Sequence, residues 1–153
     1  FSCDLKKWMQ IAEGYEKGQH AYHTTMPTDA LVRLRDVMLE TRDYGFAKVR
    51  DEQIALGAKV RALLQARGFP SVAAAGYEAP GVVVSYTTDP GIQSGKKFAE
   101  AGLQTASGVP LQCGEGADFQ TFRLGLFGLE KWHNVDRTVG HLAAALDQVA
   151  PAR

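Results

Sequence analysis

The chain is poor in the features that mark membrane, nucleic-acid-binding and disulfide-rich proteins. It has only two cysteines, Cys3 and Cys113, too few for a disulfide framework or a metal box. No apolar run approaches the roughly 20 residues that span a bilayer, and there is no signal-peptide core. Seventeen basic and seventeen acidic residues cancel, so no one-sided basic patch is indicated. We expect neither nucleic acid nor a membrane as partner, and a reducing, cytoplasmic setting.

The apolar residues that are present predict one α+β core with long helices ahead of it. The chain has 153 residues, 45% of them hydrophobic, which suffices for a single core. The order of the elements, helices first and then mixed strands and helices, predicts a small mixed or antiparallel sheet packed by helices. We expect an N-terminal helical segment over 1–44 and a small α+β domain over 45–153. The helices are expected over 4–16, 29–42, the stretch from Val49 to Gly68, 94–101 and onward from Asn134; the extended segments are expected over 81–86, 108–112 and 119–127.

Residues 22–27, Tyr-His-Thr-Thr-Met-Pro, place three hydroxyls and an imidazole directly before a predicted helix. The N-terminus of a helix attracts anions, because its first N–H groups lack partners and the helix dipole is positive there. The hydroxyls of Tyr22 and Thr25 could add hydrogen bonds to a phosphate. A plainer interpretation is that Thr25 or Thr28 caps the helix and Pro27 fills its first turn. The spacing alone leaves both interpretations open.

A second motif is Phe-Arg-Leu-Gly-Leu-Phe-Gly over 122–128, where one arginine interrupts an apolar strand. Strand alternation places Phe122 and Leu124 on one face and Arg123 on the other, away from the core. Gly125, two residues on, leaves open space beside the arginine. Such an arginine suits bidentate capture of a carboxylate. The alternative is a surface arginine whose stem lies over the sheet.

Together the two motifs resemble the C-terminal part of class V aminotransferases of the alanine–glyoxylate and serine–pyruvate type. The likeness runs along nearly the whole chain. It includes the opening over 4–8, the helix from Asp29, the Gly-Glu-Gly turn over 114–116 and the closing segment over 134–137. The resemblance implies the small C-terminal domain of a fold-type-I transferase that depends on pyridoxal 5'-phosphate and works as a homodimer.

The resemblance also implies roles for three residues. In the family, the tyrosine and the last threonine of the first motif bind the cofactor phosphate of the neighbouring subunit, which corresponds to Tyr22 and Thr25. The arginine of the second motif binds the substrate's α-carboxylate, which corresponds to Arg123. The expected reaction moves an amino group from alanine or serine to glyoxylate or pyruvate. His23 and Thr24 receive no role.

The family's Schiff-base lysine has no counterpart in this chain, because none of its lysines follows a buried strand in the required way. In the family that lysine lies upstream, in a large domain. The present sequence starts at Phe1, which is not an initiator methionine, partway through the family's pattern. We therefore expect a fragment that is inactive by itself, with its own large domain as a partner. A non-catalytic module for carboxylate binding or association is an alternative. A lyase or desulfurase of the same superfamily is another.

Two other patterns are rejected as sites on spacing. Residues 89–97 lie between a predicted strand and a helix, as a phosphate-binding P-loop does. Only three residues separate their glycines, however, and Lys97 follows Lys96 where a serine or threonine is required. His20 and His23 could suggest a metal pair, but no cysteine or carboxylate lies at ligand spacing. We expect no metal site.

Overall fold

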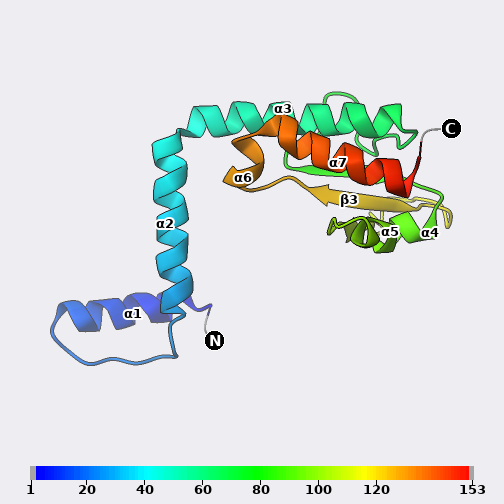
Figure 1. The fold of residues 1–153 in the computed structure, drawn as a ribbon. Coiled ribbons are helices and arrows are strands. Elements are labelled where there is room, and N and C mark those ends of the chain that lie inside the picture. The colour runs from blue at the N-terminus through cyan, green and yellow to red at the C-terminus, as the bar shows by residue number, and fades with distance from the viewer. Residues whose placement is uncertain (1–2, 152–153) are drawn as a thin grey trace. The chain divides into compact units, whose positions relative to one another are not determined.

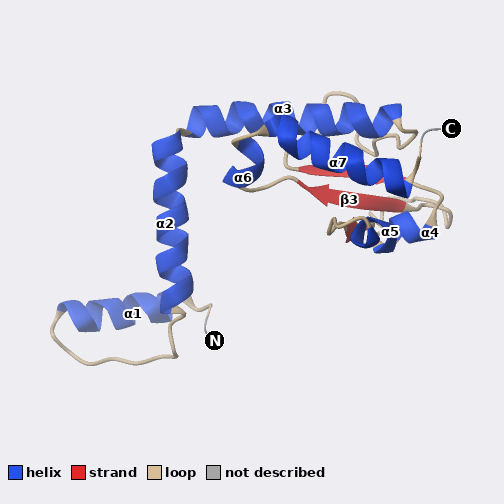
Figure 2. Cartoon of the chain, viewed as in Figure 1, coloured by secondary structure: helices blue, strands red, loops and turns tan. Residues whose placement is uncertain are grey.

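A computed structural model of the chain describes residues 3–151, in which seven helices and three strands form (Figures 1 and 2). By their internal contacts, the residues divide into two compact units, Phe1–Glu40 and Thr41–Arg153. In chain order the elements are α1 (Leu5–Glu16), α2 (Thr28–Tyr44), α3 (Phe46–Ala66), β1 (Val82–Tyr86), α4 (Pro90–Gln93), α5 (Lys96–Glu100), β2 (Ala106–Ser107), β3 (Thr121–Gly125), α6 (Leu129–Trp132) and α7 (Val135–Val149).

The first unit is built around α1, which begins where the sequence predicts. The carboxylate of Asp4 accepts a hydrogen bond from the Lys7 backbone N–H at 3.0 Å and so caps the helix. Within α1 only Ile11 and Gly14 are buried. A Cβ atom added at Gly14 would lie 3.2 Å from that of Ala21, so the loop after the helix runs back closely against it.

The second unit contains an antiparallel sheet in the order β1-β3-β2, with β3 at its centre. The expected α+β fold with a small sheet is therefore confirmed, and the sheet is antiparallel. The register pairs Val83 with Leu124 and Ser85 with Phe122, so these four side chains share one face. Arg123 of β3 lies on the opposite face, between Val84 of β1 and Ala106 of β2.

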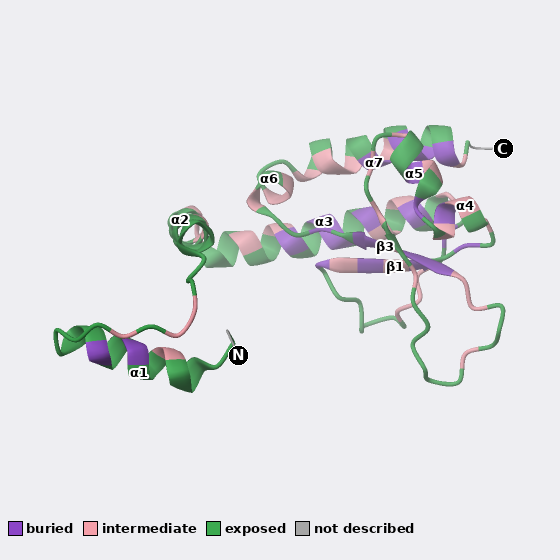
Figure 3. Ribbon diagram, turned by 90° about the horizontal axis from the view of Figure 1, so that it is seen from below, coloured by how far each residue is buried: buried purple, intermediate pink, exposed green. Residues whose placement is uncertain are grey.

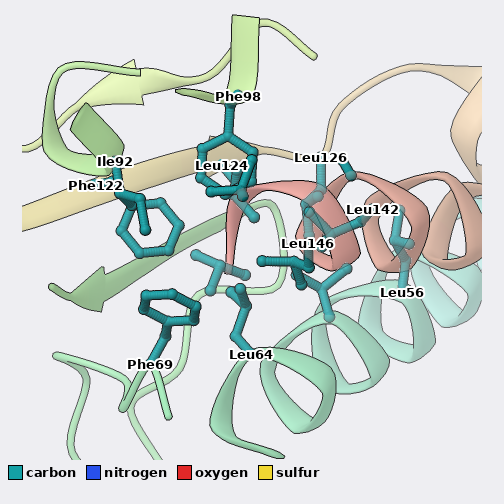
Figure 4. Packing of buried hydrophobic residues seen from close by; sticks show 14 residues of the cluster. Leu56, Leu64, Phe69, Ile92, Phe98, Phe122, Leu124, Leu126, Leu142 and Leu146 are labelled. Carbon is teal, nitrogen blue, oxygen red and sulfur yellow. The ribbon is translucent and has the colours of Figure 1, made fainter. Parts of the chain in front are cut away.

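Four helices of the second unit supply the core that covers the inner face of the sheet, and Figure 3 shows them on one side of β1 and β3 with long loops on the other. At the centre is Phe122, whose ring lies 5.4 Å from that of Phe69 and 5.6 Å from that of Phe98 (Figure 4). On the other face, called the outer face below, no helix of this unit lies among the residues that the structure describes. The buried core residues are Leu56, Val60, Leu64, Phe69, Val83, Ile92, Phe98, Phe122, Leu124, Leu126, Leu142, Ala145, Leu146 and Val149.

Two predicted elements differ in the structure. The helix expected over 94–101 is the shorter α5, and α4 forms ahead of it because Asp89 caps a turn that begins at Pro90. The prediction of an extended segment over 108–112 is wrong, because the strand in this part of the chain is β2, which ends at Ser107. Pro110 has no N–H to continue a ladder, and Gln112 has a φ of 58°, outside the β region.

Candidate functional site

Tyr22 and Thr25 lie together in the first unit. The tyrosine hydroxyl and Thr25 Oγ1 are 3.3 Å apart, and both residues are exposed. Helix α2 begins three residues later at Thr28, and the carbonyl of Pro27 accepts the Leu31 N–H at 3.0 Å. The hydrogen bond that the structure gives Thr25 therefore joins it to Tyr22 and not to the first turn of α2. The two hydroxyls therefore lie next to each other ahead of α2.

An apolar groove adjoins this hydroxyl pair within the first unit. It has a volume of about 960 Å³ and is walled by one side of α1 and by the loop that leads to α2. His23 stands in the loop wall with its ring 5.4 Å from that of Trp8, edge to face. Leu5 and Met9 of α1 are 77% and 65% exposed, so apolar side chains of this helix lie open in the unit. The hydroxyls thus sit at the polar rim of an apolar surface.

Arg123 lies in the second unit on the outer, helix-free face of the sheet, where it is half-buried. Its Nε–H donates to the carbonyl of Ser107 at 2.8 Å. Among residues 3–151 no carboxylate forms an ion pair with this guanidinium, whereas those of Arg67 and Arg137 are paired. A Cβ atom added at Gly125 would meet nothing within 4 Å. No carboxylate of the described chain thus neutralises this guanidinium, and the sheet face beside it is open at Gly125.

A third feature is the Gly-Glu-Gly turn over 114–116, where a carboxylate holds the backbone in a way that the sequence did not indicate. Glu115 accepts the backbone N–H groups of Gln112 at 2.7 Å and Cys113 at 2.8 Å. Backbone hydrogen bonds to the carboxylate, led by that of Glu115 itself, lower its pKa to about 2. A hydrogen bond to this carboxylate in turn raises the pKa of the Cys113 thiol. The signal was present as a glutamate two residues after a cysteine, next to glycines, but only the fold shows the contact.

The Cys113 thiol should consequently react slowly with alkylating reagents. A raised pKa leaves less thiolate at a given pH, and the thiolate is the nucleophile. At about pH 8, Cys113 in the folded chain should alkylate more slowly than in the urea-unfolded chain. Glu115→Gln should raise the folded rate, because the charge that favours the protonated thiol is gone. Peptide-resolved mass spectrometry after iodoacetamide pulses separates Cys113 from Cys3. A folded rate unchanged by Glu115→Gln would contradict this account.

The rejected P-loop segment is filled by the protein's own carboxylate. Asp89 accepts the N–H groups of Gly91 at 2.8 Å and Ile92 at 3.2 Å, where a phosphate would have to lie. Its other oxygen pairs with Lys97, and that hydrogen bond is the main reason why the pKa of Asp89 is lowered. Within the described residues, no group of three or more His, Cys, Asp or Glu side chains could hold a metal ion. None of the helices described is long and apolar enough to cross a membrane.

Comparisons with known proteins add no family to this picture. The chain matches no model of a known protein family, and no curated protein matches it significantly.

Proposed function

We propose that this chain is the C-terminal part of a pyridoxal-phosphate-dependent aminotransferase that moves an amino group between a small amino acid and a small 2-oxo acid. The observation that carries the proposal is Arg123, an arginine with no ion-pair partner among the described residues, on an open sheet face. The motifs around it and around Tyr22 resemble class V aminotransferases, in which the arginine serves as the carboxylate anchor.

Arg123 would bind the one group that both substrates share. An amino acid and a 2-oxo acid each carry a carboxylate next to the reacting carbon, so a single fixed cation orients both in the same way. The planar guanidinium matches a carboxylate with two parallel hydrogen bonds. The neighbours of Arg123 across the sheet are Val84 and Ala106, which offer no competing charge. Such a site favours a carboxylate over a neutral ligand.

Tyr22 and Thr25 would hold the cofactor phosphate. Their hydroxyls, 3.3 Å apart ahead of the 17-residue α2, fit a phosphate oxygen, and the N-terminus of α2 adds a favourable dipole. Asp29 in the first turn of α2 opposes an anion, so the hydroxyls must supply much of the attraction. The resemblance assigns these hydroxyls to the cofactor of a neighbouring subunit. Accordingly, they need not meet Arg123 of the same chain.

These contacts give the cofactor and the residues of this chain separate roles. When bound through the upstream lysine, the cofactor supplies an electron sink that makes proton removal from the substrate's α-carbon possible. This chain's residues bind and orient: Arg123 fixes the carboxylate, while Tyr22 and Thr25 hold the phosphate. None of them is proposed to move a proton in the reaction. The isolated chain is therefore expected to be inactive.

The two rival functions receive less support. A desulfurase needs a reactive cysteine, but the pKa of Cys113 is raised and not lowered. A non-catalytic module that binds carboxylates would also use Arg123, yet it gives no reason for the hydroxyl pair ahead of α2. The experiments below can still favour either of these two functions over the aminotransferase.

The test is transamination by the protein that carries this chain together with the domain expected ahead of it. With pyridoxal phosphate, that protein should convert alanine and glyoxylate to pyruvate and glycine. The 153-residue chain alone should show neither this activity nor a stable adduct with the cofactor. Absence of transamination by the longer protein, with all small amino donors and oxo acids tried, would overturn the proposal.

A substitution at Thr25 should loosen the cofactor. Thr25→Ala removes one hydroxyl donor to a charged phosphate, which is expected to weaken cofactor affinity by on the order of tenfold. Absorbance-monitored titration of the apoenzyme measures the change. Thr28→Ala, which removes a hydroxyl from the first residue of α2, is the matched control and should have little effect. Equal effects of the two variants would favour a general role in the start of the helix.

A further inference from the structure

We propose that the two-residue strand β2 is a positioning element that makes Arg123 bind its carboxylate end-on, through the two terminal nitrogens only. The inference rests on the proposed function of Arg123 as a carboxylate anchor. It adds the binding geometry and identifies Gly108, a residue outside the two motifs, as the residue that sets this geometry.

The guanidinium of Arg123 has three nitrogens, and they differ in what they can still bind. A guanidinium can grip a carboxylate side-on, through Nε and one terminal nitrogen, or end-on, through both terminal nitrogens. In this structure Nε–H of Arg123 already donates to the carbonyl of Ser107 at 2.8 Å. The single hydrogen on Nε can make only one good hydrogen bond, so the bond to Ser107 prevents the side-on mode. The end-on mode remains.

Strand β2 and the residue after it hold the Ser107 carbonyl in place. Ser107 lies in β2, which pairs with β3 through only two residues, Ala106 with Arg123 and Ser107 with Phe122. Beyond them, Gly108 continues the contact, and its N–H donates to the carbonyl of Thr121 at 2.9 Å. So short a strand needs this additional anchor directly next to Ser107.

The residue at position 108 must be glycine. A Cβ atom at position 108 would lie 2.0 Å from Thr121 Oγ1 and 2.2 Å from the Thr121 carbonyl oxygen. Neither distance is tolerable, and the second atom belongs to the backbone of the central strand, so it cannot rotate away. Thr121 is itself only 2% exposed. Any larger residue at position 108 must push β2 off β3 and carry the Ser107 carbonyl away from Arg123.

The consequence for binding is preorganisation. A long arginine side chain loses rotamer freedom when it binds, which weakens affinity unless the side chain is already ordered. The bond to Ser107 orders Nε before substrate arrives, and the outer sheet face leaves the terminal nitrogens free. Gly108 is thus a positioning residue: it acts through β2 on Arg123 and touches no substrate.

The experiment uses the active longer protein with Gly108→Ala, and with Gly140→Ala as the matched control. A Cβ atom added at Gly140 in α7 meets nothing within 4 Å. We expect Gly108→Ala to raise KM for both alanine and glyoxylate by between about ten- and a hundredfold, the range for one lost hydrogen bond to a charged group. The value of kcat should fall much less. Gly140→Ala should leave both unchanged.

A double-mutant cycle with Arg123→Lys separates positioning from a general structural effect. If Gly108 acts through the arginine fork, the second substitution should add little to KM once the first is present. Additive effects of Gly108→Ala and Arg123→Lys would overturn the inference and leave the proposed function intact. An Arg123→Lys variant with unchanged KM would instead overturn the proposed function.

Should Gly108→Ala fail to fold, nitrogen-15 NMR on the unaltered 153-residue chain gives the answer directly. Pyruvate is the probe, titrated while the side-chain signals of Arg123 are followed. End-on binding predicts shifts of the terminal nitrogen signals with the Nε signal nearly constant. A shift of Nε as large as that of the terminal nitrogens would overturn the inference.

Discussion

In the aminotransferase proposed above, Arg123→Lys should lower kcat/KM for both the amino acid and the oxo acid. A lysine keeps the charge but is a point donor, so it cannot reproduce two parallel hydrogen bonds to a carboxylate. Loss of a charge-assisted bidentate contact corresponds to about 2–4 kcal/mol in kcat/KM. Steady-state kinetics with alanine and with glyoxylate as the varied substrate measures the effect. Both substrates must be affected, because both present the same carboxylate.

A matched control exists for this substitution. Arg50 is an exposed arginine of α3, and Arg50→Lys changes the same chemical group away from the sheet. It should leave both kcat/KM values unchanged. If Arg123→Lys were equally silent, the arginine would have to be removed from the site.

Phe122→Ala should destabilise the second unit more than any surface change. The side chain is fully buried, and its ring packs on Phe69 and Phe98 on the inner face of the sheet. Truncation of such a residue removes apolar contacts and leaves a cavity, which costs about 3–5 kcal/mol. Urea unfolding of the chain, followed by circular dichroism, measures the change in the free energy of unfolding.

Phe127→Ala is the control for the core substitution. Phe127 lies five residues along the chain and is 61% exposed. Its loss should change the free energy of unfolding by about 0.5 kcal/mol or less. Comparable losses from the two variants would mean that the inner face is not the packed face, and the assignment of Arg123 to the outer face would fail with it.

The helices and the main strands could be predicted because local signals specify them. Asn134, whose side chain accepts the Arg137 N–H at 2.9 Å, begins α7 as expected, and the apolar spacing after it matches the buried side of that helix. Alternation along β3 correctly separated the buried Phe122 and Leu124 from Arg123. These features depend on neighbours within a few residues, which a sequence displays directly.

Contacts between distant residues could not be predicted. Gln53 is buried, and its side-chain amide makes hydrogen bonds to two distant residues. The amide oxygen accepts from Trp132 Nε1–H at 2.8 Å, 79 positions along the chain, and the amide nitrogen donates to the Pro80 carbonyl at 3.0 Å, 27 positions along. The position of strand β2 is likewise determined by a distant contact, the fit of Gly108 against Thr121, and not by a run of residues that favour strands. A search for apolar alternation therefore placed the extended segment two residues too late.

The same distinction between local patterns and distant contacts applies to the candidate site. Tyr22, Thr25 and Arg123 were found from motif and resemblance, and the structure adds the 3.3 Å contact between the two hydroxyls. The bond from Arg123 Nε to Ser107 and the Glu115 turn beside Cys113 needed the fold. Local patterns thus indicated which residues to consider, whereas the tertiary contacts determine which of their atoms remain available to a ligand.

The most direct measurement is a half-reaction: the longer protein, loaded with pyridoxal phosphate, is mixed with alanine and no oxo acid. An aminotransferase retains the amino group, so the account predicts about one equivalent of pyruvate per active site, then a halt, and renewed turnover when glyoxylate is added. Arg123→Lys should slow the release without changing its stoichiometry. Continuous formation of pyruvate without an acceptor, as a lyase would give, or no pyruvate at all, would contradict the central claim.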